Sequence, residues 1–184
     1  METRPLKTII VGGGHRSLTY AQLANIEKDK MEIVGVADPD EIRRNAIAKQ
    51  FNIPAERCFR TSDEIASVPK FADAVINGTM DHIHVSTTIP LLKAGYDVLL
   101  EKPFSVNEAE ARELVAAAEK YGRKIMVCFV LRYAPFYRKI KEIIDSKVLG
   151  EVVDIQHNEN IGYYHFAHSY VRGNWRNTDI SAPI

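Results

Sequence analysis

Short apolar runs alternate with longer amphipathic stretches along the first two thirds of the chain. A short apolar run bounded by turn residues is typical of a buried strand, and an amphipathic stretch is typical of a helix lying on a sheet. Regular alternation of the two indicates βαβ units, which build a parallel sheet with helices on its faces. The predicted strands are residues 8–11, 33–37, 74–76, 98–100 and 125–130. We therefore predict an α/β fold with a doubly wound parallel sheet.

The stretches between these strands carry helix signals at their ends. Asn107 with Glu110, and Thr61 with Glu64, match the capping box that begins a helix. The helix that begins at Asn107 has the clearest apolar face, formed by Ala111, Leu114, Val115 and Ala118. Besides the helices at these two boxes, we predict helices over residues 17–28, 41–51, 85–94 and 135–146.

Charge balance and the length of the apolar runs argue against nucleic acid and membrane as partners. The 184 residues include 24 basic and 24 acidic side chains, whereas nucleic-acid-binding domains usually carry a basic surface. No apolar run reaches the roughly 20 residues that a membrane-spanning helix needs, and the first residues lack the pattern of a secretory signal. The cysteines, Cys58 and Cys128, lie among apolar or aromatic neighbours and are expected to be reduced thiols in the core. We expect a soluble cytoplasmic protein that binds neither nucleic acid nor a membrane.

A glycine-rich turn joins the first predicted strand to the helix after it. It consists of Gly12, Gly13, Gly14, His15 and Arg16. With Ser17 in the last position it fits G-x-G-x-x-G, where glycine permits a tight turn and close approach of a pyrophosphate. The helix N-terminus then offers free N–H groups to the anion. We predict that this turn binds a dinucleotide, and that Ser17 in place of glycine loosens the packing of helix on strand slightly.

The second predicted strand ends at Asp38, at the distance from the turn where a ribose-binding acid is expected. A carboxylate can accept hydrogen bonds from both ribose hydroxyls and would repel a 2′-phosphate. Asp38 therefore favours NAD, with NADP still open. Arg43 and Arg44 follow on the next helix and could soften this preference, but we expect them to be solvated charges on a helix face.

A further charged residue stands at the end of a predicted strand. Lys102 follows the strand at residues 98–100 and precedes Pro103, which rigidifies the turn. In parallel sheets this rim is where ligands bind. By itself the segment favours an ordinary surface lysine.

Taken together, these motifs resemble the Gfo/Idh/MocA family, named after glucose-fructose oxidoreductase and inositol dehydrogenase. The resemblance rests on the glycine turn and on residues 36–39, 81–84 and 93–103, which occur in the family's order. The run Ala-Gly-x-x-Val-x-x-Glu-Lys-Pro at residues 94–103 is distinctive. The resemblance implies a Rossmann domain followed by an α/β domain with an open antiparallel sheet. It also implies an NAD(P)-dependent dehydrogenase acting on a sugar, polyol or related alcohol.

The resemblance also assigns roles to individual residues. Lys102 corresponds to a catalytic lysine that contacts substrate and cofactor, and Glu101 to a cofactor contact. Further cofactor contacts are expected on the loop after the strand at residues 74–76. They are Thr79, Asp81, His82 and His84. The loop departs from many relatives because Asn77 and Met80 stand where small residues and a proline are common. Asn77 either places its amide in the pocket or holds the turn. No metal site is expected, because His82 and His84 lack an evident third ligand.

We predict two domains, a dinucleotide-binding domain over residues 1–130 and a second region over residues 131–184. The second region would hold a crossing helix and the beginning of a substrate and oligomerisation domain. Its candidate substrate contacts are Arg132, Tyr164, His168, Arg172 and Trp175. Aromatic faces stack on sugar rings, and arginine reaches hydroxyls or carboxylates. Equally, Arg132 could brace its aromatic neighbours, and the other four could belong to an irregular surface segment.

The expected reaction is hydride transfer between a carbinol carbon and a nicotinamide, with Lys102 assisting proton movement. The family usually supplies an Asp/His base pair on a later helix, and no such helix is recognisable before Ile184. We therefore expect an N-terminal portion of a longer protein, inactive by itself, with His165 or His168 as a remote substitute base. A complete protein is expected to be a homo-oligomer. The alternatives are an NAD-dependent glycosidase of the same fold and a non-catalytic dinucleotide-binding protein.

Overall fold

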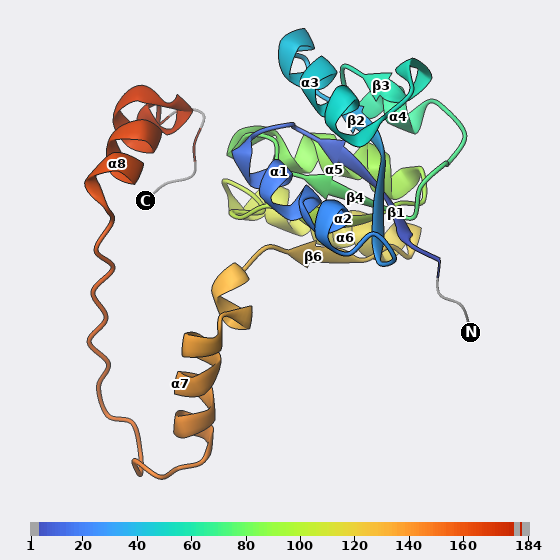
Figure 1. Cartoon of the computed structure of the whole chain (residues 1–184). Coiled ribbons are helices and arrows are strands. Elements are labelled where there is room, and N and C mark those ends of the chain that lie inside the picture. Colours follow the sequence, from blue (N-terminus) through green and yellow to red (C-terminus); the bar gives the residue numbers. More distant parts are fainter. Residues whose placement is uncertain (1–3, 179–180, 182–184) are drawn as a thin grey trace. The chain divides into compact units, whose positions relative to one another are not determined.

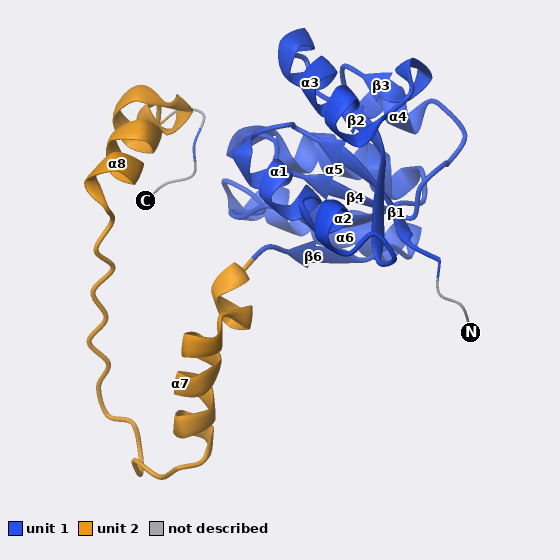
Figure 2. Cartoon of the chain, in the orientation of Figure 1, with its two compact units in different colours: residues 1–128, 179–184 blue, residues 129–178 orange. Residues whose placement is uncertain are grey.

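The computed structural model describes residues 4–178 and 181. The chain divides into two compact units, one reaching as far as Cys128 and the other covering residues 129–178 (Figure 2). Each unit is described by itself below.

The first unit is built on a six-stranded parallel sheet in the order β3-β2-β1-β4-β5-β6 (Figure 1). Its strands are β1 Leu6–Val11, β2 Met31–Ala37, β3 Cys58–Phe59, β4 Ala74–Asn77, β5 Asp97–Leu100 and β6 Ile125–Val127. The strand order reverses between β1 and β4, which pair from Thr8 with Ala74 to Val11 with Asn77. In doubly wound sheets, ligands bind at the carboxyl ends of the strands where the order reverses. The predicted α/β fold with a doubly wound parallel sheet is confirmed, and this reversal locates its candidate site.

Helices cover the sheet on both faces and divide the core in two. They are α1 His15–Ala21, α2 Leu23–Ile26, α3 Glu41–Phe51, α4 Ser62–Ala66, α5 His84–Lys93 and α6 Glu108–Tyr121. Side chains alternate along β1, so Ile9 and Val11 pack in the cluster with α4, α5 and α6, whereas Ile10 packs in the cluster with α1 and α3. These β1 residues are almost completely buried on both faces. That explains why the strand appears in the sequence as a continuous apolar run.

The helix ends follow the predicted caps closely. The Asn107 side chain accepts the N–H of Glu110 at 2.9 Å, and the Thr61 hydroxyl accepts the N–H of Glu64 at 3.3 Å. The strand predicted over residues 125–130 ends at Val127, because the chain turns into a 3₁₀ helix at Val130. Two details of the helices also differ from the prediction. Val115 is 55% exposed, because α6 turns Leu114 and Ala117 toward the core instead. The helix predicted over residues 17–28 begins earlier, at His15, and divides at Gln22 into α1 and α2.

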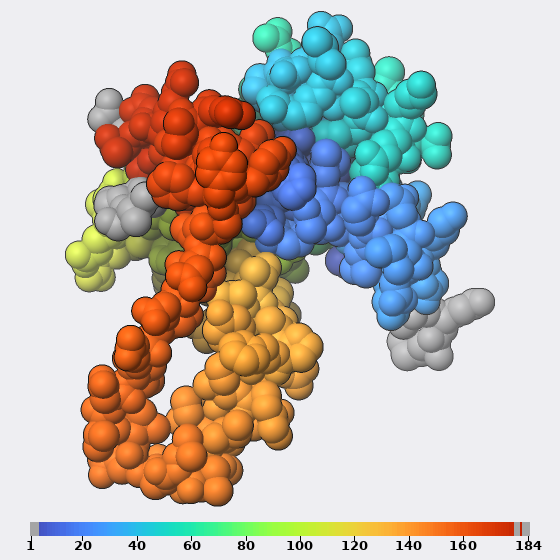
Figure 3. All heavy atoms as spheres, turned by 60° about the vertical axis from the view of Figure 1, so that its left-hand side comes forward, coloured from blue at the N-terminus to red at the C-terminus, as the bar shows by residue number. Residues whose placement is uncertain are grey.

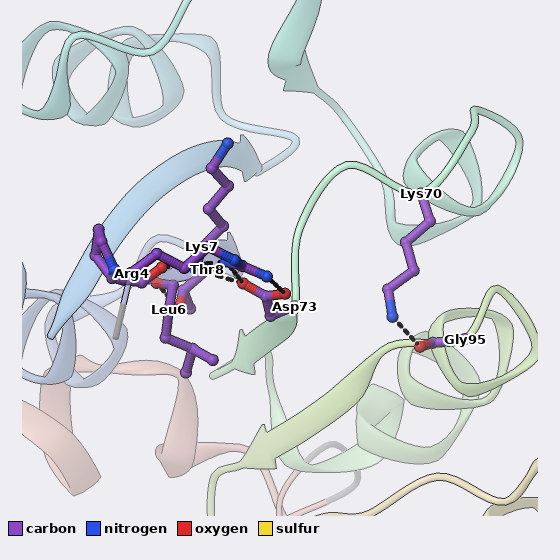
Figure 4. A network of polar contacts seen from close by, with 8 residues as sticks. Arg4, Leu6, Lys7, Thr8, Lys70, Asp73 and Gly95 are labelled. Carbon is purple, nitrogen blue, oxygen red and sulfur yellow. Dashed lines mark hydrogen bonds and ion pairs between the residues drawn. The ribbon is translucent and has the colours of Figure 1, made fainter. Parts of the chain in front are cut away.

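A polar network ties the amino ends of β1 and β4 together, at the edge opposite the glycine turn (Figure 4). The Asp73 carboxylate accepts two hydrogen bonds from the Arg4 guanidinium, both at 2.6 Å, and the N–H of Lys7 at 2.9 Å. Nearby, the Lys70 ammonium donates to the carbonyl of Gly95 at 2.6 Å. Asp73 thus holds the residues that lead into β1 against the strand beside it.

The second unit is mostly helical with an extended middle. It contains a 3₁₀ helix Val130–Tyr133, then α7 Pro135–Asp145, α8 Tyr163–Phe166, a π-helical stretch Ala167–Arg172 and a 3₁₀ helix Asn174–Arg176. Between α7 and α8, residues 152–162 form no helix or strand, and Figure 3 shows this stretch as an extended run one chain thick. Among the described helices of the chain, none is long and apolar enough to cross a membrane.

Candidate functional site

The glycine turn lies at the carboxyl end of β1, beside the point where the strand order reverses. Gly12 has φ +76°, a conformation that disfavours residues with a Cβ. A Cβ at Gly12 would lie 2.8 Å from the backbone nitrogen of Thr79, and one at Gly13 would lie 2.3 Å from Ile47 Cδ1. Gly12 is therefore required by the packing of the backbone, whereas a side chain at Gly13 would require the Ile47 side chain to move.

Gly14 differs from both, because a Cβ added there would meet no atom within 4 Å. Gly14 is the N-cap residue of α1, and as a glycine it has no side chain that could cap the first turn of the helix. His15 and Arg16, which follow it, are exposed. Open space beside free N–H groups of a helix N-terminus fits the pyrophosphate of a dinucleotide. This part of the turn can thus accept the cofactor that the motif predicts.

Ser17 and Gly78 form a complementary pair between α1 and the loop after β4. Ser17 is completely buried, and a Cβ at Gly78 would lie 2.2 Å from its hydroxyl oxygen. The hydroxyl has no hydrogen-bond partner among the described residues. Ser17 is therefore closely packed against the loop after β4, where the absence of a side chain at Gly78 leaves room for its hydroxyl.

Asp38 stands at the end of β2 and is only 3% exposed. Its carboxylate accepts the N–H of Gly13 at 2.7 Å, the N–H of Asp40 at 2.8 Å and the Nε–H of Arg43 at 3.0 Å. Arg44 donates to the main-chain carbonyl of Asp38 at 2.7 Å. Arg43 is exposed on the face of α3, as predicted, but it also pairs with the acidic residue at the site, and Arg44 is half-buried beside that residue's carbonyl.

The loop after β4 is held by the amide of Asn77, which is completely buried. Its Nδ2 donates to the hydroxyls of Thr87 and Thr88, both at 2.9 Å, and its Oδ1 accepts the N–H and the hydroxyl of Thr79. All of the amide's usual hydrogen-bonding positions are engaged within the protein. Of the two alternatives left open for Asn77, the structure supports the one in which it holds the turn.

The four candidate contacts on this loop differ in accessibility. His82 is exposed and Thr79 is half-buried, whereas Asp81 and His84 are buried. In His84, Nδ1 lies 2.7 Å from the carbonyl oxygen of Pro103 and Nε2 lies 3.0 Å from the carbonyl oxygen of Thr79. His84 therefore contacts two main-chain groups of the surrounding loops with both ring nitrogens.

Glu101 and Lys102 follow β5 and point to different surroundings. Glu101 is buried, accepts a short hydrogen bond from the Tyr20 hydroxyl, and accepts the N–H of Lys102 at 2.8 Å. Arg16 Nε lies 3.7 Å from Glu101 Oε1. The Lys102 side chain is exposed, and no protein partner for its ammonium is found in the described part of the chain. The charge of Lys102 is thus available to a ligand.

Two groups beside Glu101 stay protonated more strongly than usual. Burial, together with the hydrogen bond to Glu101, raises the pKa of the Tyr20 hydroxyl. Burial raises the pKa of the Cys128 thiol to about 11. Near neutral pH the Tyr20 phenol and the Cys128 thiol beside the Glu101 carboxylate are therefore both protonated. Cys128 is buried and Cys58 half-buried, and neither forms a disulfide.

The candidate substrate contacts all lie in the second unit. Arg132 is exposed and its guanidinium lies over the Phe129 ring, 5.4 Å from the centroid. Tyr164 and His168 stack with centroids 6.2 Å apart. Arg172 and Trp175 are also exposed. The described residues contain no group of three or more His, Cys, Asp or Glu side chains that could hold a metal ion.

Tyr20 is a residue of the site that the sequence did not reveal, because it contacts Glu101 across 81 positions of the chain and no local pattern marks it. Arg43 was considered for its effect on the cofactor preference, but its pairing with Asp38 was not predicted. A residue in the first turn of a helix lies near the end of the preceding strand, and this signal could have indicated the pair. The pair spans five positions.

The strand order, the glycine turn at its reversal and Asp38 define a dinucleotide-binding domain of the Rossmann class. A family described as an oxidoreductase family with an NAD-binding Rossmann fold matches residues 6–129. The chain belongs to this family, Gfo/Idh/MocA, as the motifs predicted.

The sequences of two related dehydrogenases align with this chain over only part of their own length. Trans-1,2-dihydrobenzene-1,2-diol dehydrogenase of Xenopus laevis is 32% identical over 121 residues, which are 66% of this chain and 36% of that protein. Inositol 2-dehydrogenase of Corynebacterium glutamicum is 26% identical over 165 residues, 87% of this chain and 48% of that protein. The chain thus spans less than half the length of either relative.

Solved structures agree on the fold. Myo-inositol 2-dehydrogenase of Lactobacillus plantarum superposes with a TM-score of 0.73 at 20% identity, covering 82% of this chain and 44% of that one. The WlbA dehydrogenase of Chromobacterium violaceum, in complex with NADH and UDP-GlcNAcA, gives a TM-score of 0.75 at 23% identity, covering 82% of this chain and 42% of that one.

Proposed function

We propose that this chain is the cofactor-binding part of an NAD(P)-dependent dehydrogenase that acts on a CH–OH group of a sugar, polyol or related alcohol. The observation that carries the proposal is the meeting of three features at one edge of the sheet. They are the open space at Gly14, the buried carboxylate of Asp38 and the exposed ammonium of Lys102. The names of the inositol and dihydrodiol dehydrogenases among the relatives support the substrate class.

The residues divide into those that would hold each part of the cofactor. The backbone of Gly12, Gly13 and Gly14, with the side chains of His15 and Arg16, would bind the pyrophosphate. Asp38 would receive the adenosine ribose. The remaining contacts would lie beside the nicotinamide half, and they are Thr79, Asp81, His82, Glu101 and Lys102. His84 would support this half from behind, because it is completely buried. A bound nicotinamide supplies the hydride acceptor for oxidation of an alcohol.

Lys102 would be the catalytic residue of this chain. Its ammonium can hydrogen-bond the substrate hydroxyl and help to move the hydroxyl proton while the carbon is oxidised. We expect Lys102→Met in the full-length protein to lower kcat at least tenfold with little change in the Kd for NADH. Lys93→Met, at an exposed lysine that ends α5, is the matched control. Unchanged turnover in Lys102→Met would contradict this role.

The choice of cofactor follows from the pair formed by Asp38 and Arg43. The carboxylate favours a ribose with free hydroxyls, so NAD is the main cofactor. The Arg43 side chain is 47% exposed next to that carboxylate, at 3.0 Å, and offers a cation to a 2′-phosphate. NADP would therefore be accepted with lower affinity.

Residues 131–184 would belong to a second, substrate-binding domain. Its aromatic and cationic side chains suit a small sugar or polyol, and the assignment covers Arg132, Tyr164, His168, Arg172 and Trp175. We place the protein in the cytoplasm and expect a homo-oligomer in its complete form.

Calorimetric titration with NADH tests the proposal. Binding with a micromolar to sub-millimolar Kd is expected, and an absence of binding at millimolar NADH would contradict it. In the full-length protein, NAD reduction with polyols supports the dehydrogenase. Hydrolysis of glycosides without net NAD reduction would instead favour the glycosidase alternative, and binding without any turnover would favour the non-catalytic one.

A further inference from the structure

Lys102 has a long, flexible side chain, so its usefulness to a reaction depends on how firmly its backbone is held. The ammonium stands on four methylene groups, so its conformational freedom stays large unless the backbone of the lysine is fixed. The backbone leaves β5 after Leu100, and among the described residues the Glu101 N–H makes the last ladder hydrogen bond to β4. The groups that contact the turn at residues 101–103 therefore determine where Lys102 can reach.

One set of contacts reaches the turn from α1. The Tyr20 hydroxyl donates to Glu101 Oε1, and Glu101 Oε2 accepts the Lys102 N–H at 2.8 Å. Glu101 itself is buried, and its own N–H donates to the carbonyl of Asn77 at 2.9 Å. The carboxylate thus connects a phenol on α1 to the peptide group of the lysine.

A second contact reaches the turn from the other side, through α5. His84, completely buried, lies with Nδ1 2.7 Å from the carbonyl oxygen of Pro103, the residue after Lys102. Its other nitrogen lies 3.0 Å from the carbonyl oxygen of Thr79, on the loop after β4. The ring therefore lies between the two loops that follow β4 and β5, with one nitrogen near a carbonyl of each.

We propose that Tyr20 and His84 are positioning residues that clamp the Lys102 turn from its two sides, Tyr20 through the Glu101 carboxylate and His84 through the Pro103 carbonyl. The value of the clamp for catalysis rests on the proposed function, whereas the clamp itself does not. Neither side chain needs to touch substrate. Their effect is to hold the backbone of Lys102 in one position, so that its ammonium occupies a smaller range of positions.

The test is amide hydrogen exchange of Lys102 in the complete chain, followed by NMR or mass spectrometry. Tyr20→Phe keeps the ring and removes only the hydroxyl. We expect it to speed exchange at Lys102 about tenfold, which is the effect of losing one hydrogen bond to a charged group. Exchange of the Arg123 amide, which donates to Ala118 on α6, serves as the remote reference. Tyr121→Phe is the matched control, since no hydrogen-bond partner for the Tyr121 hydroxyl is found among the described residues and the residue is half-buried.

The two nitrogens of His84 can be tested separately. An asparagine amide nitrogen takes the place of Nδ1, and a glutamine amide nitrogen takes the place of Nε2. We therefore expect His84→Asn to preserve slow exchange at Lys102, and His84→Gln to speed it about tenfold. A side chain that merely fills space would not distinguish the two. If the histidine variants do not fold, Tyr20→Phe decides the proposal without them.

Two results would overturn the clamp. One is unchanged Lys102 exchange in both Tyr20→Phe and His84→Gln. The other is equal acceleration at Lys102 and Arg123, which would signify general loss of stability. Titration of the wild-type chain with NADH judges the proposed function separately. A wild-type chain that fails to bind NADH but shows the expected exchange pattern refutes the proposed function and keeps the clamp.

Discussion

The Asp38 carboxylate accepts the backbone N–H of Gly13 at 2.7 Å, so the acidic end of β2 directly holds the glycine turn after β1. The glycine-rich turn and the acidic residue that follows β2 therefore form one hydrogen-bonded structure. The turn is shaped before any ligand arrives, and a preformed site avoids the cost of ordering it on binding.

Glycines of this turn should separate folding from binding. Gly14→Ala adds a methyl group into open space and should leave the free energy of unfolding within about 0.5 kcal/mol, but weaken NADH binding. Gly13→Ala should lower the free energy of unfolding by about 1–3 kcal/mol, because its Cβ would lie 2.3 Å from Ile47 Cδ1. Urea unfolding and calorimetry on both variants check this. Equal NADH affinity in Gly14→Ala and wild type would contradict a pyrophosphate at this position.

The pair of Ser17 and Gly78 should show reciprocal rescue. Gly78→Ala should destabilise the protein by about 1–3 kcal/mol, since the new Cβ would lie 2.2 Å from the buried hydroxyl. Ser17→Gly together with Gly78→Ala should recover most of this loss. A double-mutant cycle measured by urea unfolding gives the coupling free energy. Additive effects of the two substitutions would show that they are not in contact in the way described.

Arg43 should determine how well NADP is tolerated. Arg43→Ala removes the cation beside Asp38 and should weaken NADPH binding at least fivefold more than NADH binding. Arg112→Ala, an exposed arginine on α6, is the control of equal charge. Titrations with both cofactors at one ionic strength measure the ratio, because exposed charges are screened by salt. An unchanged ratio would remove Arg43 from the cofactor site.

Alkaline pH should weaken the fold through Tyr20. Its pKa is raised by burial and by Glu101, so in the pH range just above 10 the unfolded phenol ionises while the folded one stays protonated. Stability from this group is complete below pH 10 and falls as the pH rises beyond it. Tyr20→Phe should flatten the decline in the free energy of unfolding between about pH 9.5 and 11. Identical pH profiles for the variant and wild type would contradict the raised pKa.

Acid should release the network at Asp73. The hydrogen bonds from Arg4, aided by the Lys7 N–H, hold the pKa of Asp73 at about 2, below its usual 3.8. Its contribution is complete above about pH 4 and is lost as the pH falls toward 2. Because Arg4 is largely exposed, we expect Asp73→Asn to cost no more than about 1 kcal/mol at neutral pH. The cost should be much smaller at pH 2, where about half of the folded Asp73 is protonated, with exposed Glu32→Gln as control. A cost that is as large at pH 2 as at neutral pH would indicate a packing effect.

Much of the fold could be predicted because its signals are local. An apolar run such as residues 8–11 reports burial of β1 on both faces, and α3 has the predicted bounds Glu41–Phe51. The capping residues Thr61 and Asn107 begin helices by contacting backbone three positions away. Such patterns depend only on residues that are close in the sequence, so they can be recognised without knowledge of the fold.

Pairings across the chain could not be predicted in this way. The hydrogen bond of Tyr20 to Glu101 spans 81 positions, and that of Gly13 to Asp38 spans 25. Val115, predicted for the core from its spacing, is exposed because the orientation of α6 is set by the helices and strands around it. The periodicity of a helix gives an apolar face but not its width or the neighbour it meets.

The amino-acid pattern was enough to predict the parallel sheet, the dinucleotide turn and the position of Lys102 at a strand end, because alternation of strands and helices brings such residues to the carboxyl ends of the strands. The contacts that each residue makes at this end of the sheet became visible only in the folded chain. It paired Arg43 with Asp38, fitted Ser17 to Gly78 and set His84 between two carbonyl groups. These roles depend on distances of a few ångströms between segments remote in the chain, and packing alone fixes those distances.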